Sequence, residues 1–90
     1  MYNENMYNYQ TEKQAVFTEE GQEMFLIIRN KSKKLLEQAG CFTMKKVIQG
    51  TCGDSFIMLA CVDRLVELKE IREIKQSEHV AYQHKIFVSI

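Results

Sequence analysis

The chain has 90 residues, which is enough for one domain. A chain this short buries only about two-thirds of its unfolded surface, so we expect a marginal core that a partner subunit would stabilise. Its 12 basic and 12 acidic residues give zero formal net charge, which argues against strong phosphate binding except through a local basic patch. Apolar residues make up 46%, too many for a disordered chain.

Three cysteines, Cys41, Cys52 and Cys61, occur without CxxC spacing. An odd number of cysteines without a leader sequence predicts reduced thiols and a cytoplasmic location. Residues 1–10 are rich in Asn and Tyr and lack the apolar core of a signal peptide. The longest apolar run, residues 56–62, is too short to cross a membrane, so we expect no membrane contact.

Residues 1–15 are interpreted as an N-terminal arm, followed by one domain over residues 16–90. Tyr2, Tyr7 and Tyr9 are set among asparagines in this arm. Two explanations stay open. The arm is either a frayed and disordered terminus, or it packs on a partner subunit through its tyrosines.

A first helix is predicted over residues 18–39. Thr18 is a suitable N-cap, and Gly40 follows as a C-terminal cap. The apolar positions share one helical stripe, which we expect to face the core. They are Met24, Phe25, Ile28, Leu35, Leu36 and Ala39.

A short strand at residues 41–42 and a second helix over residues 44–49, capped by Thr43, are predicted next. The glycine-containing turn at residues 50–53 has the length of a helix-turn-helix junction. Asp54 or Ser55 then caps a third helix that continues to about residue 69.

After the third helix, the pattern changes to that of a β-hairpin. Residues 71–75 and 81–90 are predicted as two strands, joined by a wide loop at residues 76–80. In the second strand, alternation places Tyr82, His84, Ile86 and Val88 on one face. The fold class is therefore α+β, with three helices and a small antiparallel hairpin.

From about residue 18 onward, the chain resembles the winged helix-turn-helix domains of bacterial transcriptional regulators. The segment Val62-Asp63-Arg64-Leu65-Val66-Glu67-Leu68-Lys69-Glu70-Ile71-Arg72 is similar to their passage from recognition helix to first wing strand. The hairpin would be the wing. In that family a glycine often ends the helix just before this strand, whereas this chain has Lys69 or Glu70 there.

The resemblance implies a transcriptional regulator that binds double-stranded DNA as a homodimer. Its alternative is a winged-helix module for protein–protein contact that does not bind DNA, because fold alone does not specify function. The first helix or the N-terminal arm would form the dimer seam.

The expected DNA-contacting residues lie on the second helix, the third helix and the wing. They are Lys45, Lys46, Ser55, Arg64, Lys75, His79 and Lys85. Residues 29–46 hold six basic residues and a single acid, Glu37, whereas residues 54–73 hold five acids and three bases. The lysines are compatible with a solvated face as well as with a phosphate footprint.

The third helix is apolar on all sides at its start, since Phe56, Ile57 and Ala60 lie opposite the predicted core face. Three explanations compete. These residues are covered by the arm or by a partner's first helix, they face a protein ligand, or they contact thymine methyl groups. An exposed Phe-Ile pair would promote nonspecific association, which favours burial of these side chains by the arm or by a partner subunit.

No catalytic or cofactor-binding motif is found, so we expect neither enzymatic activity nor a cofactor. A zinc site is not expected, because the cysteines and the two histidines, His79 and His84, lack ligand spacing. Cys61 is predicted to fill core volume, and Cys52 to be an exposed thiol.

Overall fold

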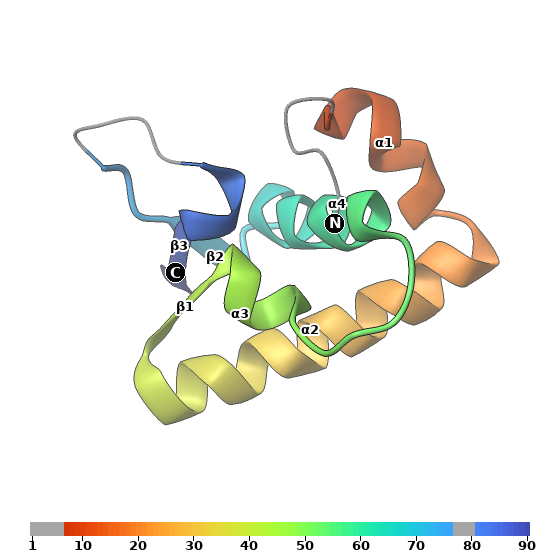
Figure 1. Ribbon diagram of the computed structural model, residues 1–90. Helices are drawn as coiled ribbons and strands as arrows, with labels where there is room; N and C mark the ends of the chain where they lie inside the picture. The colour runs from red at the N-terminus through yellow and green to blue at the C-terminus, as the bar shows by residue number, and fades with distance from the viewer. Residues whose placement is uncertain (1–6, 77–80) are drawn as a thin grey trace.

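The computed structural model describes residues 7–76 and 81–90. Within these residues, four α-helices pack beside a small three-stranded antiparallel sheet (Figure 1). This confirms the α+β class and is compatible with a winged-helix-like arrangement. In chain order the elements are α1 (Tyr9–Val16), α2 (Glu19–Ala39), β1 (Cys41–Thr43), α3 (Met44–Ile48), α4 (Ser55–Glu67), β2 (Ile71–Glu73), the 3-10 turn η2 (Tyr82–His84) and β3 (Ile86–Ser89).

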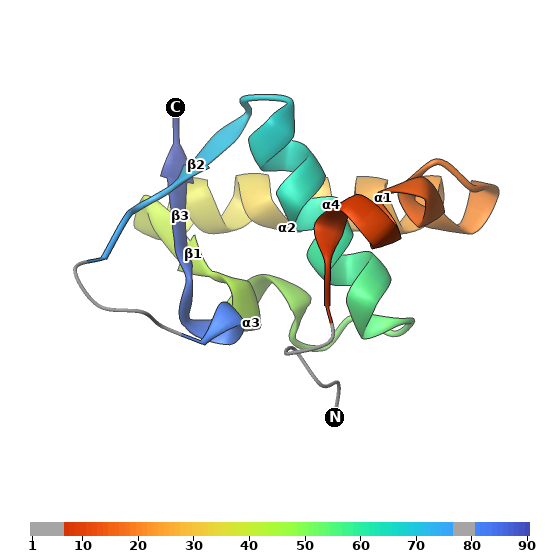
Figure 2. The ribbon, with the colours of Figure 1, turned by 90° about the horizontal axis from the view of Figure 1, so that it is seen from above.

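Helix α4 lies between α1 and α2 (Figure 1). Seen from above, the sheet lies beside the C-terminal half of α2, and α1 lies beside its N-terminal half (Figure 2). The core forms where α2, α4 and the sheet meet, and it includes Ile28, Leu59, Leu65 and Phe87, each at most 1% exposed. Helix α4 is thus the central element of the chain.

Helix α2 forms as its caps predict. The Thr18 side chain accepts a hydrogen bond from the Gly21 backbone N–H, and Gly40 ends the helix with a left-handed φ of 78°. Met24 and Ile28 are buried as expected. The predicted stripe is wrong at Ala39, which is exposed, because the last turn extends past the elements that cover the rest of the helix.

The strand and helix predicted after α2 are confirmed. Thr43 caps α3 by accepting from the Lys46 N–H, and Val47 is fully buried. Asp54, one of the two predicted caps, caps α4 by accepting from the Phe56 and Ile57 N–H groups at 2.8 and 3.3 Å.

Strand β3 is the middle strand of the sheet, in the order β1-β3-β2. Phe87 pairs with Phe42 of β1 and with Glu73 of β2, and the two phenylalanine rings stack 5.6 Å apart. The sheet therefore ties the segment before α3 to the segment after α4.

The second predicted strand is wrong over its first half. Residues 82–84 form η2, in which the His84 N–H donates to the Ala81 carbonyl at 2.9 Å. This turn points the Tyr82 hydroxyl at Asp63 of α4, a tertiary contact that alternation cannot predict. The first strand also stops at Glu73, and residues 77–80 of the predicted loop lie outside the described residues.

The N-terminal arm differs most from its prediction. Residues 1–6 lie outside the described residues, but Tyr9–Val16 is a helix. Asn8 caps it by accepting from the Thr11 N–H at 3.3 Å, and Val16 at its end is 1% exposed. The described part of the arm is thus held on its own chain.

The end of α4 uses an unusual residue. Lys69 has a φ of 62°, the left-handed conformation that the capping position requires and that glycine adopts most easily. The Glu70 N–H donates to the Leu65 carbonyl and the Lys69 N–H to the Val66 carbonyl, both at 3.0 Å. This is the Schellman pattern of helix termination.

We predict that Lys69→Gly raises the free energy of unfolding by roughly 0.5–1 kcal/mol, because it removes the penalty on a Cβ in this conformation. Urea unfolding measures the change. Lys69→Ala is the matched control, since it removes the charge but keeps the Cβ. An equal effect of the two substitutions would show that the left-handed conformation is not the cause.

Candidate functional site on the outer face of α4

One face of α4 points away from the α2 core and toward α1. We call it the outer face and define it by Phe56, Ala60, Asp63 and Glu67, which follow helical spacing. Ala60 is fully buried, and Phe56 and Asp63 are half-buried. The helix is therefore covered on both sides, by α2 and by the N-terminal segment with α1.

Asp63 joins three segments that are distant in the sequence. Its Oδ2 accepts hydrogen bonds from the Tyr7 hydroxyl at 2.7 Å and from the Tyr82 hydroxyl at 2.6 Å. The two tyrosine rings meet edge to face at 5.0 Å. One carboxylate therefore holds the N-terminal segment and η2 on α4.

Burial raises the pKa of Asp63 above its usual value, and the two tyrosine hydrogen bonds oppose that rise. The pKa of each tyrosine is also raised, first by burial and then by the hydrogen bond to Asp63. Both hydroxyls consequently remain protonated and can donate.

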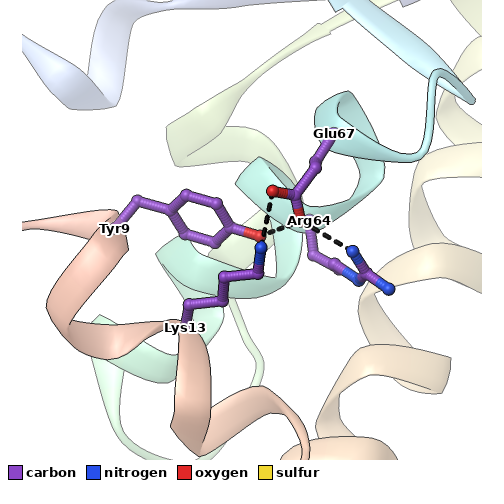
Figure 3. A network of polar contacts seen from close by, with 4 residues as sticks. All are labelled: Tyr9, Lys13, Arg64 and Glu67. Carbon is purple, nitrogen blue, oxygen red and sulfur yellow. Dashed lines mark hydrogen bonds and ion pairs between the residues drawn. The ribbon is translucent and has the colours of Figure 1, made fainter.

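Glu67 forms a second attachment for α1 (Figure 3). Its Oε1 accepts from the Tyr9 hydroxyl at 2.9 Å, and its Oε2 accepts from the Lys13 ammonium at 2.7 Å. Tyr9 and Lys13 are one turn apart on α1, so both side chains reach the same carboxylate. Arg64 adds a third hydrogen bond at 2.6 Å.

The hydrogen bond from Lys13, followed by those from Arg64 and Tyr9, lowers the pKa of Glu67 to about 2. The carboxylate therefore stays ionised well below neutral pH. It favours the docked position of α1 wherever it carries its charge.

The acidic character of residues 54–73 now has a structural cause, because each acid has a partner within the chain. Asp54 caps α4, Asp63 and Glu67 hold the N-terminal segment, Glu70 pairs with Arg29 at 2.7 Å, and Glu73 lies 3.7 Å from Lys85. These charges organise the fold of the chain.

The residues predicted to contact DNA come from α3, α4 and the segments that flank β2 and β3. Lys45 and Lys46 are exposed on α3, and Ser55 is half-buried at the start of α4. Lys75 and Lys85 both lie near Glu73, and Lys85 also stacks over the Tyr82 ring at 4.0 Å. His79 lies outside the described residues.

Arg64 is engaged within the chain. It bonds Glu67 and lies over the Phe17 ring at 5.1 Å. These contacts place the Arg64 side chain where α4 meets the turn between α1 and α2. There it holds the Glu67 carboxylate in position.

The predicted interaction surface is turned inward. Phe56 and Ile57 are half-buried, Ala60 is fully buried, and the Tyr7 ring lies 5.8 Å from the Phe56 ring. Of the three explanations, coverage by the N-terminal segment is the one that matches, and the cover comes from the same chain. Ala60 cannot reach another molecule while α1 is in place.

The residues that fasten α1 were not among the predicted site residues. Two sequence signals could have identified them, namely the Asn8 cap and the spacing of Tyr9 and Lys13 on one helical face. The Asn- and Tyr-rich composition of this segment concealed both signals.

A pocket with both apolar and polar lining opens where the α1–α2 turn meets the end of α4. We call it the turn pocket. Its volume is about 250 Å³, and Phe17 and Leu68 at its rim are 53% and 43% exposed. It is lined by Val16, Phe17, Gln22, Phe25, Arg64 and Leu68.

The cysteines show no shared site. Cys61 is buried, which confirms its predicted place in the core, and burial raises its pKa to about 12. Cys52 is exposed as predicted, and so is Cys41. Residues 7–76 and 81–90 contain no group of three or more His, Cys, Asp or Glu side chains that could hold a metal ion.

No helix in the described part of the chain has the length and apolar character to span a membrane. Comparison of the chain with protein-family models, with curated proteins and with solved structures found no match.

We predict that Glu67→Gln flattens the acid dependence of stability. Because the pKa of Glu67 falls from 4.5 to about 2 on folding, its contribution is present above about pH 4.5 and is lost as the pH falls toward 2. Asp63 acts in the opposite direction, since its raised pKa makes protonation favour the folded chain.

Urea unfolding over a series of pH values measures this effect in the wild type and in Glu67→Gln. Tyr9→Phe, which removes one of the three donors to Glu67, should give an intermediate slope. Identical slopes in the wild type and in Glu67→Gln would contradict the assigned role of Glu67.

Proposed function

We propose that this chain is a protein-interaction module with a winged-helix-like arrangement. In it, α4 receives a helix on its outer face where a recognition helix would face DNA. The observation that carries the proposal is the attachment of α1 across that face through Asp63 and Glu67.

Two physical arguments favour protein contact over groove reading. The major groove is about 12 Å wide, and a single helix with its side chains already measures about 10–12 Å across. Packed together, α1 and α4 exceed that width. If α1 moved away, Asp63 and Glu67 would point toward the phosphates, which repel carboxylates.

The turn pocket suits a protein partner. Its volume of about 250 Å³ is below the range of about 300–1,000 Å³ usual for small-molecule sites, and it matches one large side chain. Phe17 and Leu68 form an exposed apolar rim around it. Binding energy at protein interfaces concentrates where such an anchor side chain fills a pocket.

A homodimeric DNA-binding regulator is the second candidate. It is supported by Lys45 and Lys46, which are exposed on α3 and have no ion pair among the described residues. Such lysines could contact the DNA backbone with α1 still docked, but this contact positions a protein without reading sequence.

Binding to mixed-sequence duplex DNA at low and moderate salt separates the two candidates. The assay uses the wild type and a Tyr9→Ala, Lys13→Glu variant, which weakens the hold on α1. We predict no steeply salt-dependent binding by either protein, because releasing α1 exposes carboxylates.

Strong, salt-sensitive binding would contradict the proposal. If the wild type binds and Lys45→Ala with Lys46→Ala weakens it, the regulator is favoured with α3 as its contact. If only the α1-weakened variant binds, α1 is a cover over a DNA-reading helix.

The turn pocket is tested with indole as a side-chain-sized probe. In NMR titrations we expect indole to shift the methyl signals of Val16 and Leu68 in the wild type. Leu68→Asp should abolish the shift of Val16, whereas Arg72→Glu, at an exposed position that does not line the pocket, should preserve it. Equal shifts in the wild type and in Leu68→Asp would exclude the pocket as an apolar anchor site.

A further inference from the structure

The outward surface of α2 carries two exposed apolar side chains near its midpoint. Leu26 is 56% exposed and Ile27 is 51% exposed, and both point away from the buried positions Met24 and Ile28. In a protein of this size, an adjacent pair of half-exposed aliphatic side chains on a regular helix is a site where contact with another molecule gains free energy.

The charges on either side of this pair have opposite signs. Glu19, Glu20 and Glu23 precede it, and Lys33 and Lys34 follow it. None of these five side chains has a hydrogen bond or ion pair within residues 7–76 and 81–90. The other two basic residues of α2 form contacts within the chain. Arg29 pairs with Glu70, and Lys31 donates to the Gln49 carbonyl and to the Thr51 hydroxyl.

The unpaired charges and the apolar pair lie on one stripe. Two rows of residues repeat along α2 at intervals of seven. One row is Glu19, Leu26 and Lys33, and the other is Glu20, Ile27 and Lys34. Seven residues are close to two full helical turns, so the two rows run side by side along the helix. Glu23, Asn30 and Glu37 lie between them with the same spacing.

We propose that this stripe is a homodimer seam, in which α2 of a second copy packs antiparallel across Leu26 and Ile27. A two-fold axis level with these residues keeps each row on its own edge of the seam, so it brings Leu26 of each copy against Leu26 of the other, and Ile27 against Ile27. Glu20 and Lys34 lie about 10 and about 11 Å from the axis along the helix, in opposite directions, at a rise of about 1.5 Å per residue. They therefore meet across the seam.

The same axis places Glu19 opposite Lys33 of the second copy and Glu23 opposite Asn30 of the second copy. Each of the three acids that precede the apolar pair thus meets a lysine or an amide that can donate to it, and Glu37 lies beyond the first residue of the second copy's α2. A parallel arrangement would instead set acids against acids and lysines against lysines. The order acid, apolar, base along α2 is self-complementary only when the helices are antiparallel, which is why the occupant is a second copy.

Formation of this dimer does not require α1 to leave its position on α4. Helix α1 packs on α4, and Phe56 of α4 contacts the Tyr7 ring, so neither contributes to the interface, in contrast to the predicted role of the arm. The inference is also independent of the proposed function, since either a protein-interaction module or a DNA-binding protein could dimerise in this way.

Sedimentation equilibrium over a range of concentrations tests the seam. The wild type is expected to dimerise. Glu20→Lys alone and Lys34→Glu alone should each weaken dimerisation roughly tenfold or more, because each sets like charges against each other twice per dimer. Mixing the two variants should restore association as a heterodimer, since both contacts then pair opposite charges.

Two positions off the stripe give charge-matched controls, the half-buried Glu12 (Glu12→Lys) on α1 and the exposed Arg72 (Arg72→Glu) on β2, and these variants should dimerise like the wild type. Leu26→Asp with Ile27→Asp should be monomeric, with the helical circular dichroism retained. A monomeric wild type would overturn the seam. So would single variants that dimerise like the wild type, or a mixture that associates no better than its components.

Discussion

The contact of Asp63 with Tyr7 and Tyr82 is the interaction on which the arrangement depends. A carboxylate set against α1 and η2 loses water contacts, and this loss is offset only if buried donors replace them. The tyrosine hydroxyls are such donors, at 2.7 and 2.6 Å. Without Asp63, each hydroxyl would be left unsatisfied at a cost of about 1–3 kcal/mol. Thus the docking of the N-terminal segment and the turn before β3 are coupled through one side chain.

This coupling explains why α4 is apolar on nearly every side. A surface helix needs one apolar stripe, whereas a helix packed between two others needs apolar residues on both faces. From Met58 to Val62 every side chain of α4 is at most 3% exposed. The outer face is acidic only where the N-terminal segment supplies matching donors, at Asp63 and Glu67. Because most of α4 is buried within the chain, contacts with other molecules are expected on the surfaces of the elements that surround it.

Two such surfaces have been described, and they differ in what they would bind. The turn pocket is a concave site of side-chain size with Phe17 and Leu68 at its rim, suited to an anchor residue of another protein. The α2 stripe is convex and self-complementary in charge, suited to a second copy of this chain. Both would add buried surface to a domain whose own core is small.

Local signals in the sequence predicted much of the fold. Thr18, Thr43 and Asp54 mark the starts of α2, α3 and α4, because a side-chain cap acts on its own helix and can be recognised without knowing the tertiary structure. The glycine-containing turn before α4 is likewise a local feature. The order of helices and strands follows from these signals.

The candidate site was much less predictable, because it depends on contacts between distant positions. Tyr7 and Asp63 are 56 residues apart, and nothing near either residue in the sequence points to the other. The same contact turns residues 82–84 out of the predicted strand. Arg64 was predicted to contact DNA from its charge and helix position alone, whereas its partner Glu67 and the Phe17 ring are set by packing.

The docking of the N-terminal segment on the outer face of α4 is the feature from which the rest of the arrangement follows. Solution NMR of the full chain at neutral pH tests it most directly, through nuclear Overhauser effects between the Tyr7 ring and the rings of Phe56 and Tyr82. We expect both, since the ring centroids lie 5.8 and 5.0 Å apart, together with slowed amide exchange in α1. Absence of these effects, with α1 amides exchanging as in an unfolded peptide, would contradict the account.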